Sequence, residues 1–398
     1  MLIPMLHRMW RTTDIRLLWK FAYNFGFKSV LSVERFKRRL KKGVVFPPFL
    51  YLSIINSCNL RCRGCWVDVG AERRMIPLDD LNRLIRAAKK HGNRFFGILG
   101  GEPFLHPDLI DVLRAHPECY FQIFTNGHYI TDEVAGELRR IGNATPLVSI
   151  EGSELVSDER RGRAGVFSKT VAGLEVCLRN RLITGVTTSV CRNNYEDLVR
   201  EEWVDELIRR GVHYVWYTTY RPVGPDPAPE LALDREQMLG VRRFAMRIRN
   251  TKPIIVVDAY WDHEGRALCP AVIGISHHIG PGGDIEPCPV VQFAKDSIRD
   301  WGGDVFRTIT ESRFLADFRE TAGAATRGCI ILEHPEILHK LVTSDGVRDT
   351  TSRATGATEL AAMAPRPSQY QPGAELPEEN WMYRMAKRYW FFGFGAYS

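Results

Sequence analysis

Long apolar runs, a secretory leader and a dense set of cysteines are all missing from this sequence of 398 residues. No uncharged apolar run reaches the roughly 18 residues that a membrane-spanning helix needs. The first residues are basic and amphipathic, without the apolar core and small-residue cleavage site of a signal peptide. Nine cysteines in a chain of this length do not form the dense disulfide framework of a small secreted domain. We therefore expect a protein of the reducing cytoplasm.

The composition is that of a soluble globular protein with an uneven charge. Hydrophobic residues make up 44% and charged residues 25% of the chain, and the length allows about two domains. The net charge is +7, yet residues 1–45 alone hold eleven Lys and Arg against two acidic residues. The positive charge is therefore concentrated at the start of the chain.

Residues 1–45 are expected to form a basic amphipathic helical segment. Apolar residues recur at helical spacing over residues 17–25, and Met5, Leu6 and Trp10 precede them. Such a helix suits a membrane interface, and the basic run 37–42 favours anionic lipid. A helix packed on the rest of the protein, with a solvated basic face, is an equally good interpretation. A nucleic-acid patch is a weaker one, and we expect no nucleic-acid partner.

Residues 46–250 alternate apolar strands with longer helical patterns, which is typical of parallel βα units in an α/β fold. The pattern predicts about six strands, fewer than the eight of a closed barrel. The expected strands are 49–55, 95–99, 120–124, 147–150, 185–190 and 214–218. The expected helices include 78–90, 168–180, 198–210 and 235–250.

Three cysteines with the spacing C-x3-C-x2-C, Cys58, Cys62 and Cys65, follow the first of these strands. A loop leaving a buried strand can bring three thiolates around one inorganic group, and a cluster of four irons normally takes four cysteines. Three ligands would leave one iron open to bind something else. Two other interpretations stand. One is a zinc site, for which a nearby fourth ligand is missing because the next histidine is His91; the other is a set of unrelated buried thiols.

A glycine-rich turn, Gly100-Gly101-Glu102-Pro103, follows the strand 95–99. Two glycines at this point let the backbone approach a ligand closely, and Glu102 can accept a hydrogen bond from an ammonium group. A simple turn without a ligand is the alternative.

A serine and an arginine follow the fourth expected strand. Ser149 lies near its end, next to Glu151, and Arg161 comes later in the run Asp158-Glu159-Arg160-Arg161-Gly162. The guanidinium fork of an arginine suits a carboxylate, although a surface ion pair of Arg161 with Asp158 or Glu159 would also explain it.

The triple-Cys motif, with Trp66 directly after it, resembles the signature of the radical S-adenosylmethionine (radical SAM) enzymes. The resemblance implies a partial (βα)6 TIM-like barrel whose open side admits the substrate. It also implies a 4Fe–4S cluster on Cys58, Cys62 and Cys65, whose open iron binds S-adenosylmethionine (SAM). In that family one electron cleaves SAM, and the resulting 5'-deoxyadenosyl radical abstracts hydrogen from the substrate.

The same resemblance assigns roles to the later motifs. Gly100, Gly101 and Glu102 match the family's GGEP motif, which binds the amino group of SAM. Ser149 would face the nucleoside, and Arg161 would bind the methionine carboxylate. Glu151 stands where the family more often has an aspartate, so no role is carried over to it.

A second set of cysteines, Cys269, Cys288 and Cys329, lies in the last third of the chain. The sequence Gly282-Gly283-Asp284 predicts a tight hairpin that leads to Cys288. This arrangement resembles the SPASM or twitch extension of radical SAM enzymes, and it implies a second, auxiliary 4Fe–4S cluster. The family usually supplies more cysteines here, so the cluster would have an open site or a non-Cys ligand from among His263, His277, His278 and His334. Three separate structural thiols are the alternative.

The remaining segments and thiols carry less specific signals. Residues 344–380 are rich in Thr, Ser, Ala, Gly and Pro and are expected to be a linker or flexible loop. Residues 381–398 combine aromatic with basic residues, which suits either a membrane interface or a plug on the barrel. Cys119, Cys177 and Cys191 are expected to be core thiols. The expected division of the chain is 1–45, 46–250, 251–343, 344–380 and 381–398.

We expect a radical SAM enzyme that acts on a hydrophobic, lipid-like substrate at the inner face of the membrane, with flavodoxin or ferredoxin as the reducing partner. The alternatives are a peptide-modifying maturase of the RiPP type and, outside enzymes, an iron–sulfur electron carrier. The sequence identifies neither a catalytic residue nor the bond that is formed. Candidate substrate-side groups are Tyr217, Arg221, Asp258, Tyr260 and His263.

Overall fold

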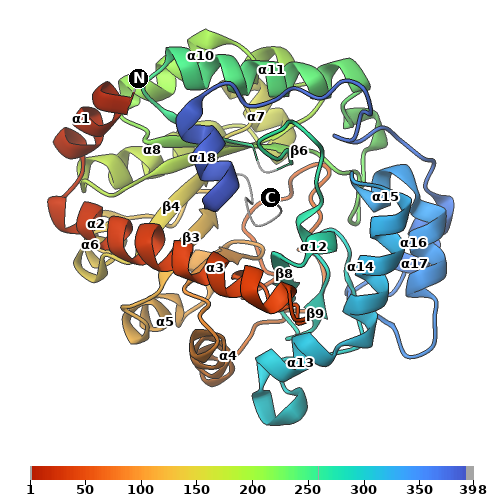
Figure 1. The fold of residues 1–398 in the computed structure, drawn as a ribbon. Coiled ribbons are helices and arrows are strands. Elements are labelled where there is room, and N and C mark those ends of the chain that lie inside the picture. The colour runs from red at the N-terminus through yellow and green to blue at the C-terminus, as the bar shows by residue number, and fades with distance from the viewer. Residues whose placement is uncertain (1, 259, 391–398) are drawn as a thin grey trace.

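A nine-stranded sheet organises the protein (Figure 1). The computed structural model describes residues 2–258 and 260–390. The strands lie in the order β7-β6-β5-β4-β3-β2-β1-β8-β9, and every neighbouring pair is parallel except β8 and β9. Their bounds are β1 Phe49–Ser53, β2 Phe95–Leu99, β3 Tyr120–Thr125, β4 Ala144–Ser149, β5 Gly185–Val190, β6 Tyr214–Thr219, β7 Ile255–Asp258, β8 Ser276–Ile279 and β9 Ile285–Glu286.

Helices between the strands cover the outside of this sheet, which makes it the open, partial barrel that was predicted (Figure 1). Each helix buries one apolar stripe; in α4, for example, Leu81, Leu84 and Ile85 are buried. The helices of this layer are α4 Leu78–Lys90, α5 Leu109–Ala115, α6 Asp132–Ile141, α7 Glu154–Arg161, α8 Val166–Arg179, α9 Tyr195–Leu198, α10 Glu201–Arg210 and α11 Arg235–Thr251, with short 3-10 turns at Pro103–Leu105 and Pro229–Leu231.

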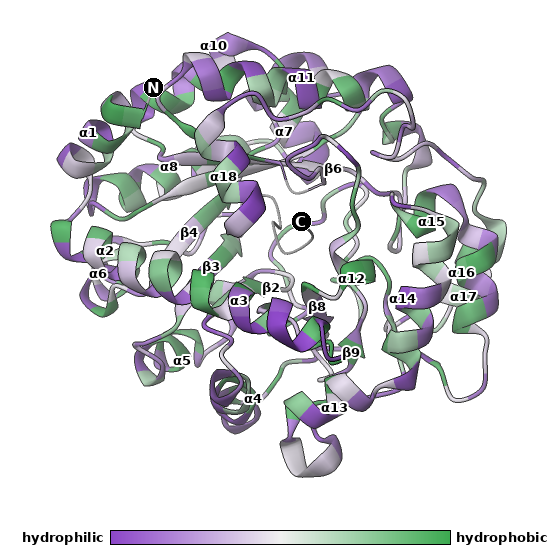
Figure 2. Ribbon diagram, viewed as in Figure 1, coloured by the Kyte–Doolittle hydropathy of each residue, from purple (hydrophilic) through white to green (hydrophobic). Residues whose placement is uncertain are grey.

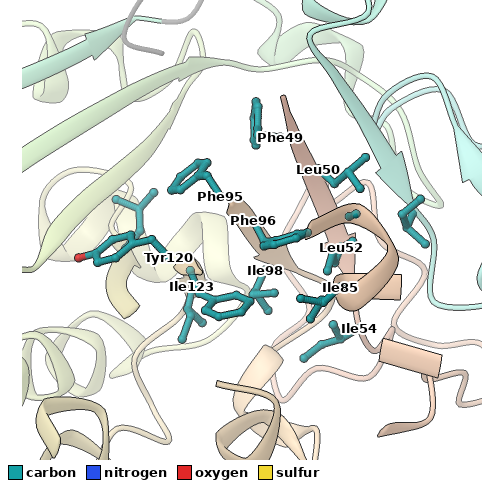
Figure 3. Packing of buried hydrophobic residues seen from close by; sticks show 14 of the residues in the cluster. Phe49, Leu50, Leu52, Ile54, Ile85, Phe95, Phe96, Ile98, Tyr120 and Ile123 are labelled. Carbon is teal, nitrogen blue, oxygen red and sulfur yellow. The ribbon is translucent and has the colours of Figure 1, made fainter. Parts of the chain in front are cut away.

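The parallel strands are buried on both faces, and the apolar core consists of one large cluster, which includes β1–β3, and a second around β5–β7, α10 and α11. Along β1, Leu50 and Leu52 face the outer helices, while Phe49 points into the barrel against Phe95 of β2 (Figure 3). Ile85 of α4 packs in the same cluster. The strand ends that carry the loops at the carboxyl side are therefore held by a rigid scaffold.

The basic N-terminal segment packs across the amino-terminal ends of the strands. It forms α1 Leu2–Thr12, α2 Ile15–Lys20, a π-helical turn at Phe21–Phe27 and α3 Lys28–Leu40. Its polar side chains donate to carbonyls just before the strands: Arg8 to Val212 before β6, Lys20 to Ile141 before β4, Asn24 to Pro117 before β3, Arg39 to His91 before β2, and Ser32 to Pro48 before β1. The segment is thus a helical cap on the barrel, as the packed interpretation expected.

The extension is continuous with the barrel sheet. Strand β8 pairs in parallel with β1, and the hairpin that was predicted at Gly282-Gly283-Asp284 returns as β9. Strand β7, which the sequence division placed outside the barrel, pairs with β6 at the other edge. The extension's other elements are α12 Pro270–Ile273, β10 Phe293–Ala294, a 3-10 turn at Asp300–Gly303, α13 Val305–Glu311, α14 Arg313–Ala325, α15 Ile330–Glu333 and α16 Pro335–Val342. Helices α14, α15 and α16 gather on one side of the molecule (Figure 1).

Residues 344–380 are not the flexible linker that was predicted. They contain β11 Arg348–Asp349, which pairs with β10, and α17 Gly356–Ala362, which packs on α16. Their polar side chains bond to distant parts of the chain; Ser368 donates to Glu333, and Gln371 donates to the Arg235 carbonyl. These partners lie far away in the sequence, so local composition could not predict that this segment is ordered.

The last described helix, α18 Trp381–Tyr389, docks on the barrel through a buried charge cluster. Lys387 donates to Asp258 at 3.0 Å, and Asp258 also pairs with Arg242 and Arg249. Residues 391–398, which belong to the predicted aromatic segment, lie outside the described residues. Within the described part of the chain, no helix combines the length and the apolar character needed to cross a bilayer.

Candidate active site at the carboxyl ends of the strands

The loop after β1 carries Cys58, Cys62 and Cys65, and all three thiols are partly buried. They lie close enough for each to affect the others: burial raises the pKa of Cys58 to about 11, with a smaller contribution from Cys62, and burial together with Cys62 raises the pKa of Cys65 to about 12. The three thiols therefore lie near one another in this loop. Thiolates are the ligands that iron–sulfur clusters take.

The glycine turn after β2 holds the start of this loop through its backbone. The Gly101 amide donates to the Ile55 carbonyl at 2.8 Å, and the Glu102 amide donates to the Ser57 carbonyl at 2.9 Å. A Cβ on Gly101 would lie 2.2 Å from the Ser57 oxygen, and a Cβ on Gly100 would lie 2.2 Å from the Ile55 oxygen. The two glycines are thus required for this backbone-to-backbone approach.

The other side of the Cys loop rests on α7 and on the loop after β6. The Arg63 amide donates to the Arg160 carbonyl at 2.9 Å, and Nε of Arg160 donates back to the Arg63 carbonyl at 3.0 Å. A Cβ on Gly224 would lie 2.2 Å from the Cys65 carbonyl oxygen. Contacts within the protein therefore hold this loop on several sides.

The Glu102 carboxylate is fully buried and is held by protein donors. It accepts hydrogen bonds from the Thr125 hydroxyl at 2.8 Å, the Asn126 amide at 2.8 Å and the Phe104 amide at 3.1 Å. Burial raises its pKa to about 7. Nδ2 of Asn126 lies 3.8 Å from Sγ of Cys58, so Glu102 braces the turn that contacts the Cys loop.

Arg161 lies beside the thiols and pairs with Glu151. Its Nη1 is 3.7 Å from Sγ of Cys62, and its Nη2 is 2.5 Å from Oε1 of Glu151. The proposed surface pair with Asp158 is wrong, because that carboxylate accepts from the backbone amides of residues 165 and 167. Ser149 ends β4 on the same side of the sheet. Glu151, which had no predicted role, orients this arginine.

The second set of cysteines also converges. Burial raises the pKa of Cys269 to about 11, with a contribution from Cys329, and the pKa of Cys288 is raised by burial and by both of the other thiols. Arg221, at the end of β6, donates to Sγ of Cys329 at 3.3 Å and stacks on Tyr260 with its guanidinium 4.6 Å from the ring centroid. A buried positive charge thus faces each set of thiols, which suits anionic thiolates.

The histidines that could complete the second set are in different states. His278 is engaged at both ring nitrogens, by Ser53 at 2.7 Å and by Glu286 at 2.5 Å, so it is not a free ligand. His277 contacts the Pro287 carbonyl through Nδ1, and its buried Nε2 has no hydrogen-bond partner among the described residues. Within the described ranges, no three His, Cys, Asp or Glu side chains are grouped around a single ion.

Several of the other residues singled out in the sequence are structural. Cys119, Cys177 and Cys191 are fully buried, as predicted. Tyr217 donates to the Leu198 carbonyl inside the core, and Asp258 belongs to the charge cluster under α18. The sequence missed Arg160, Asn126 and Glu151 as supports of the Cys loop. Their only sequence signal was their position directly after strands or beside Arg161.

Comparisons with known proteins agree with this arrangement. Residues 52–201 match the family described as the Radical SAM superfamily. An AdoMet-dependent heme synthase of Methanosarcina barkeri is 28% identical over 201 residues, which is 48% of this chain and 57% of that protein. The sporulation killing factor maturation protein SkfB of Bacillus subtilis is 20% identical over 311 residues, 75% of this chain and 73% of SkfB. The chain spans little more than half the length of the heme synthase.

Solved structures share the fold beyond the matched domain. SuiB of Streptococcus suis bound to its precursor peptide SuiA superposes with a TM-score of 0.60 at 19% identity, covering 71% of this chain and 69% of SuiB. The enzyme anSMEcpe with bound AdoMet superposes with a TM-score of 0.53 at 15% identity, covering 68% and 82% of the two chains.

Residues 52–201 therefore form a domain of the Radical SAM superfamily, and the chain as a whole shares its fold with SuiB and anSMEcpe. The cofactors of this class are a 4Fe–4S cluster and SAM, with auxiliary clusters in SPASM relatives. Enzymes of this class act on a substrate with the help of a reductant.

Proposed function

We propose that this chain cleaves SAM reductively and transfers a hydrogen atom from a hydrophobic substrate at the surface of an anionic membrane. When bound, the cluster and SAM supply the 5'-deoxyadenosyl radical. Cys58, Cys62 and Cys65 would hold the cluster, and the braced loop that carries all three thiols, with Arg161 beside Cys62, is the observation that carries the proposal. Cys269, Cys288 and Cys329 would hold the auxiliary cluster.

The protein's own residues supply position and charge for this chemistry. Arg161 presents a guanidinium beside the Cys62 thiol and would bind the methionine carboxylate. Gly100 and Gly101 bring backbone close to the loop, and Glu102 fixes the Thr125-Asn126 turn beneath it. Ser149, at the end of β4, would face the nucleoside. Such a fixed, polar frame needs little rearrangement when a charged ligand binds.

The membrane part of the proposal is supported by the outer face of the helical cap. Of the seventeen large hydrophobic side chains that are exposed among the described residues, ten lie on residues 2–40 and three on α18. Trp10 is 59% exposed, Trp19 72% and Phe27 57%. Exposed apolar residues are normally scattered, so this concentration marks an interaction surface. The apolar face consists of Ile3, Leu6, Trp10, Ile15, Trp19, Tyr23, Phe27, Val30, Leu31, Leu40, Trp381, Met385 and Tyr389.

The two parts of this face are joined. Trp390 contacts Phe25 in a tilted arrangement with ring centroids 5.2 Å apart, and Lys37 donates to the Arg388 carbonyl at 3.3 Å. Exposed basic residues accompany the apolar ones: Arg11, Arg16, Arg35, Arg38, Lys41, Lys42, Arg384 and Arg388. The C-terminal part of α3 is visibly hydrophilic next to the apolar positions (Figure 2). Aromatic rings and basic side chains together suit the headgroup region of an anionic bilayer.

Vesicle binding tests this part directly. We expect the protein to sediment with vesicles of phosphatidylglycerol and phosphatidylcholine, and less so as salt rises. The triple variant Trp10→Ala, Trp19→Ala, Phe27→Ala should lose binding about 1000-fold or more, since each ring contributes about 1.5 kcal/mol. The control is a variant in which Leu155 and Trp301 are replaced by alanine. These side chains are 78% and 54% exposed but lie outside the apolar face, so the control should bind like wild type. Equal binding by both variants would refute the membrane face.

A peptide-modifying function is the second candidate. It is favoured by the similarity to SkfB, which covers three quarters of this chain, because SkfB is named as a maturation protein of a killing factor. It predicts that a short peptide encoded in the same organism binds the purified protein. Capture of such a peptide, together with absence of vesicle binding, would favour this candidate over the membrane proposal.

A further inference from the structure

A pocket of about 510 Å³ lies where helices α1 and α2 of the cap meet the barrel. Part of its lining comes from Arg139, in the last turn of α6, and from Arg181, between α8 and β5. The rest comes from the junction of α1 and α2, which contributes Trp10, Arg11, Thr13, Asp14 and Ile15. Trp10 and Ile15 are exposed and belong to the apolar face. The pocket therefore opens beside side chains that would enter a membrane.

The lining of this pocket carries an excess of positive charge. Three arginines stand against one carboxylate, which leaves a net charge of +2. The Asp14 carboxylate is already paired with Nη2 of Arg16 and with Nε of Arg139, each at 2.9 Å. Hydrogen bonds from Arg16 and then from Arg139 hold the pKa of Asp14 well below its usual range. Arg11 and Arg181 are exposed, and neither pairs with a carboxylate of the described residues.

Contacts with the cap hold Arg181 at the pocket. Its φ of 58° lies in the left-handed region, which residues other than glycine rarely adopt. The Asp14 amide donates to the Arg181 carbonyl at 3.0 Å, and Nη2 of Arg181 donates to the Thr13 carbonyl at 3.1 Å. Strained backbone of this kind persists where tertiary contacts fix it, often at binding sites. The other two guanidinium nitrogens make no hydrogen bond with the described residues, so they are available to a ligand.

The free donors of the pocket suit a phosphate group. An arginine presents a planar fork of N–H groups that matches two phosphate oxygens, and the opposite charges strengthen these hydrogen bonds. Arg11 and Arg181 line the same pocket with such donors unpaired. The volume lies within the range of small-molecule sites, so the pocket accommodates a phosphate together with the group that carries it.

Trp10 and Ile15 distinguish between two sources of such a phosphate. A soluble phosphate compound would contact the arginines and leave the exposed apolar side chains beside them in water. A phospholipid would contact both, because its acyl chains continue from the headgroup into an apolar layer. Indole rings are also favoured at the level of the headgroups. The neighbourhood of the two kinds of side chain therefore favours a lipid.

We propose that this pocket binds the phosphate of an anionic phospholipid headgroup. Arg11 and Arg181 donate to the phosphate oxygens, and Trp10 and Ile15 contact the glycerol and the start of the acyl chains. This inference rests on the proposed function, because it takes the apolar face as the side that meets the membrane. It adds a headgroup site with named residues to a face that would otherwise attract lipid only through diffuse charge.

Titration with a short-chain lipid tests the site without a membrane. The probe is dihexanoylphosphatidylglycerol below its critical micelle concentration, added to the full-length protein and followed by calorimetry. Dihexanoylphosphatidylcholine and glycerol phosphate are the comparisons. We expect wild type to bind the probe at least tenfold more tightly than either comparison, because the zwitterionic lipid brings a cation to the arginines and glycerol phosphate lacks the acyl chains.

Two variants remove the proposed donors, and a third is the control. Arg11→Gln and Arg181→Gln should each weaken binding of the probe at least tenfold, because each loses a charged hydrogen bond. Arg38→Gln removes the same charge from an exposed position of α3 outside the pocket and should bind within twofold of wild type. The Arg11 side chain makes no hydrogen bond or ion pair with the described residues, so Arg11→Gln tests the site even if Arg181→Gln disturbs the junction.

Equal binding of the probe by wild type and Arg11→Gln would overturn the proposal. Glycerol phosphate that binds as tightly as the probe would overturn the lipid as the ligand and indicate a soluble phosphate compound. Sedimentation with vesicles judges the membrane face separately. If wild type sediments with vesicles while Arg11→Gln and Arg38→Gln bind the probe alike, the pocket is refuted and the proposed function stands.

Discussion

Nη1 of Arg161 lies 3.7 Å from Sγ of Cys62. The two residues are almost a hundred positions apart in the sequence, one at the end of α7 and the other in the loop after β1. The opposite edge of the guanidinium pairs with Glu151, which fixes its orientation. A positive charge is thereby held beside the thiols, where it can pair with the carboxylate of a bound ligand.

Replacing this arginine should weaken SAM binding without removing the iron. We expect Arg161→Met to raise the dissociation constant of SAM about tenfold or more, because a charged hydrogen bond is worth about 1.5–3 kcal/mol. Equilibrium dialysis with anaerobically reconstituted protein measures this. Arg163→Met, two residues away and exposed, is the matched control. The assignment is wrong if the two variants bind SAM equally well.

Gly224 should be required for the shape of the Cys loop. It has a φ of +103° and no room for a Cβ next to the Cys65 carbonyl. Gly224→Ala should therefore lower iron incorporation severalfold. Gly43→Ala carries a similar backbone penalty, since Gly43 has a φ of +72°, but nothing lies within 4 Å of its Cβ position. Iron analysis of the two variants separates the steric effect from the backbone effect. Equal iron contents would contradict this account.

The protonation of Glu102 should make stability depend on pH. Burial raises its folded-state pKa to about 7, while the unfolded chain titrates near 4.3. Between these values the folded protein holds a proton that the unfolded chain has lost. The free energy of unfolding should therefore fall by about 3 kcal/mol as pH rises through this window. Urea unfolding of wild type and Glu102→Gln at pH 5 and pH 7.5 measures it. Parallel curves for the two proteins would refute the shift.

The charge cluster under α18 should be a major source of stability. Asp258 is buried with Arg242, Arg249 and Lys387 around it. Asp258→Asn removes the negative partner and leaves buried cations, which costs about 3–5 kcal/mol. Asp132→Asn breaks the exposed pair with Arg179 and should cost far less, because solvent screens an exposed ion pair. Chemical denaturation compares the two, and similar losses would contradict the structural role given to the cluster.

Much of the barrel could be predicted because its signals are local. The apolar runs that become β2 and β5 and the amphipathic pattern of α4 have the same bounds in sequence and structure. The parts of the fold that could not be predicted depend on long-range contacts. Nothing near β8 indicates that it pairs with β1, more than two hundred residues earlier. The order of residues 344–380 comes from partners such as Glu333, which composition does not reveal.

The same distinction holds at the site. The spacing of Cys58, Cys62 and Cys65 and the glycines after β2 could be identified from the sequence because each motif is contiguous. The supports could not be identified, because Arg160 reaches Arg63, and Arg221 reaches Cys329, only after the sheet has formed. The sequence left open whether the N-terminal segment is a membrane helix or a helix packed on the barrel. The structure reveals that one side of these helices caps the barrel while the other is exposed.

Formation of 5'-deoxyadenosine tests the central claim most directly. The reconstituted protein is incubated without oxygen, with dithionite and SAM, and the nucleoside is quantified by chromatography and mass spectrometry. We predict that wild type forms 5'-deoxyadenosine and methionine in equal amounts, and that Cys62→Ala forms neither. A wild-type protein that carries iron and sulfide yet leaves SAM intact would contradict the account and favour an electron carrier.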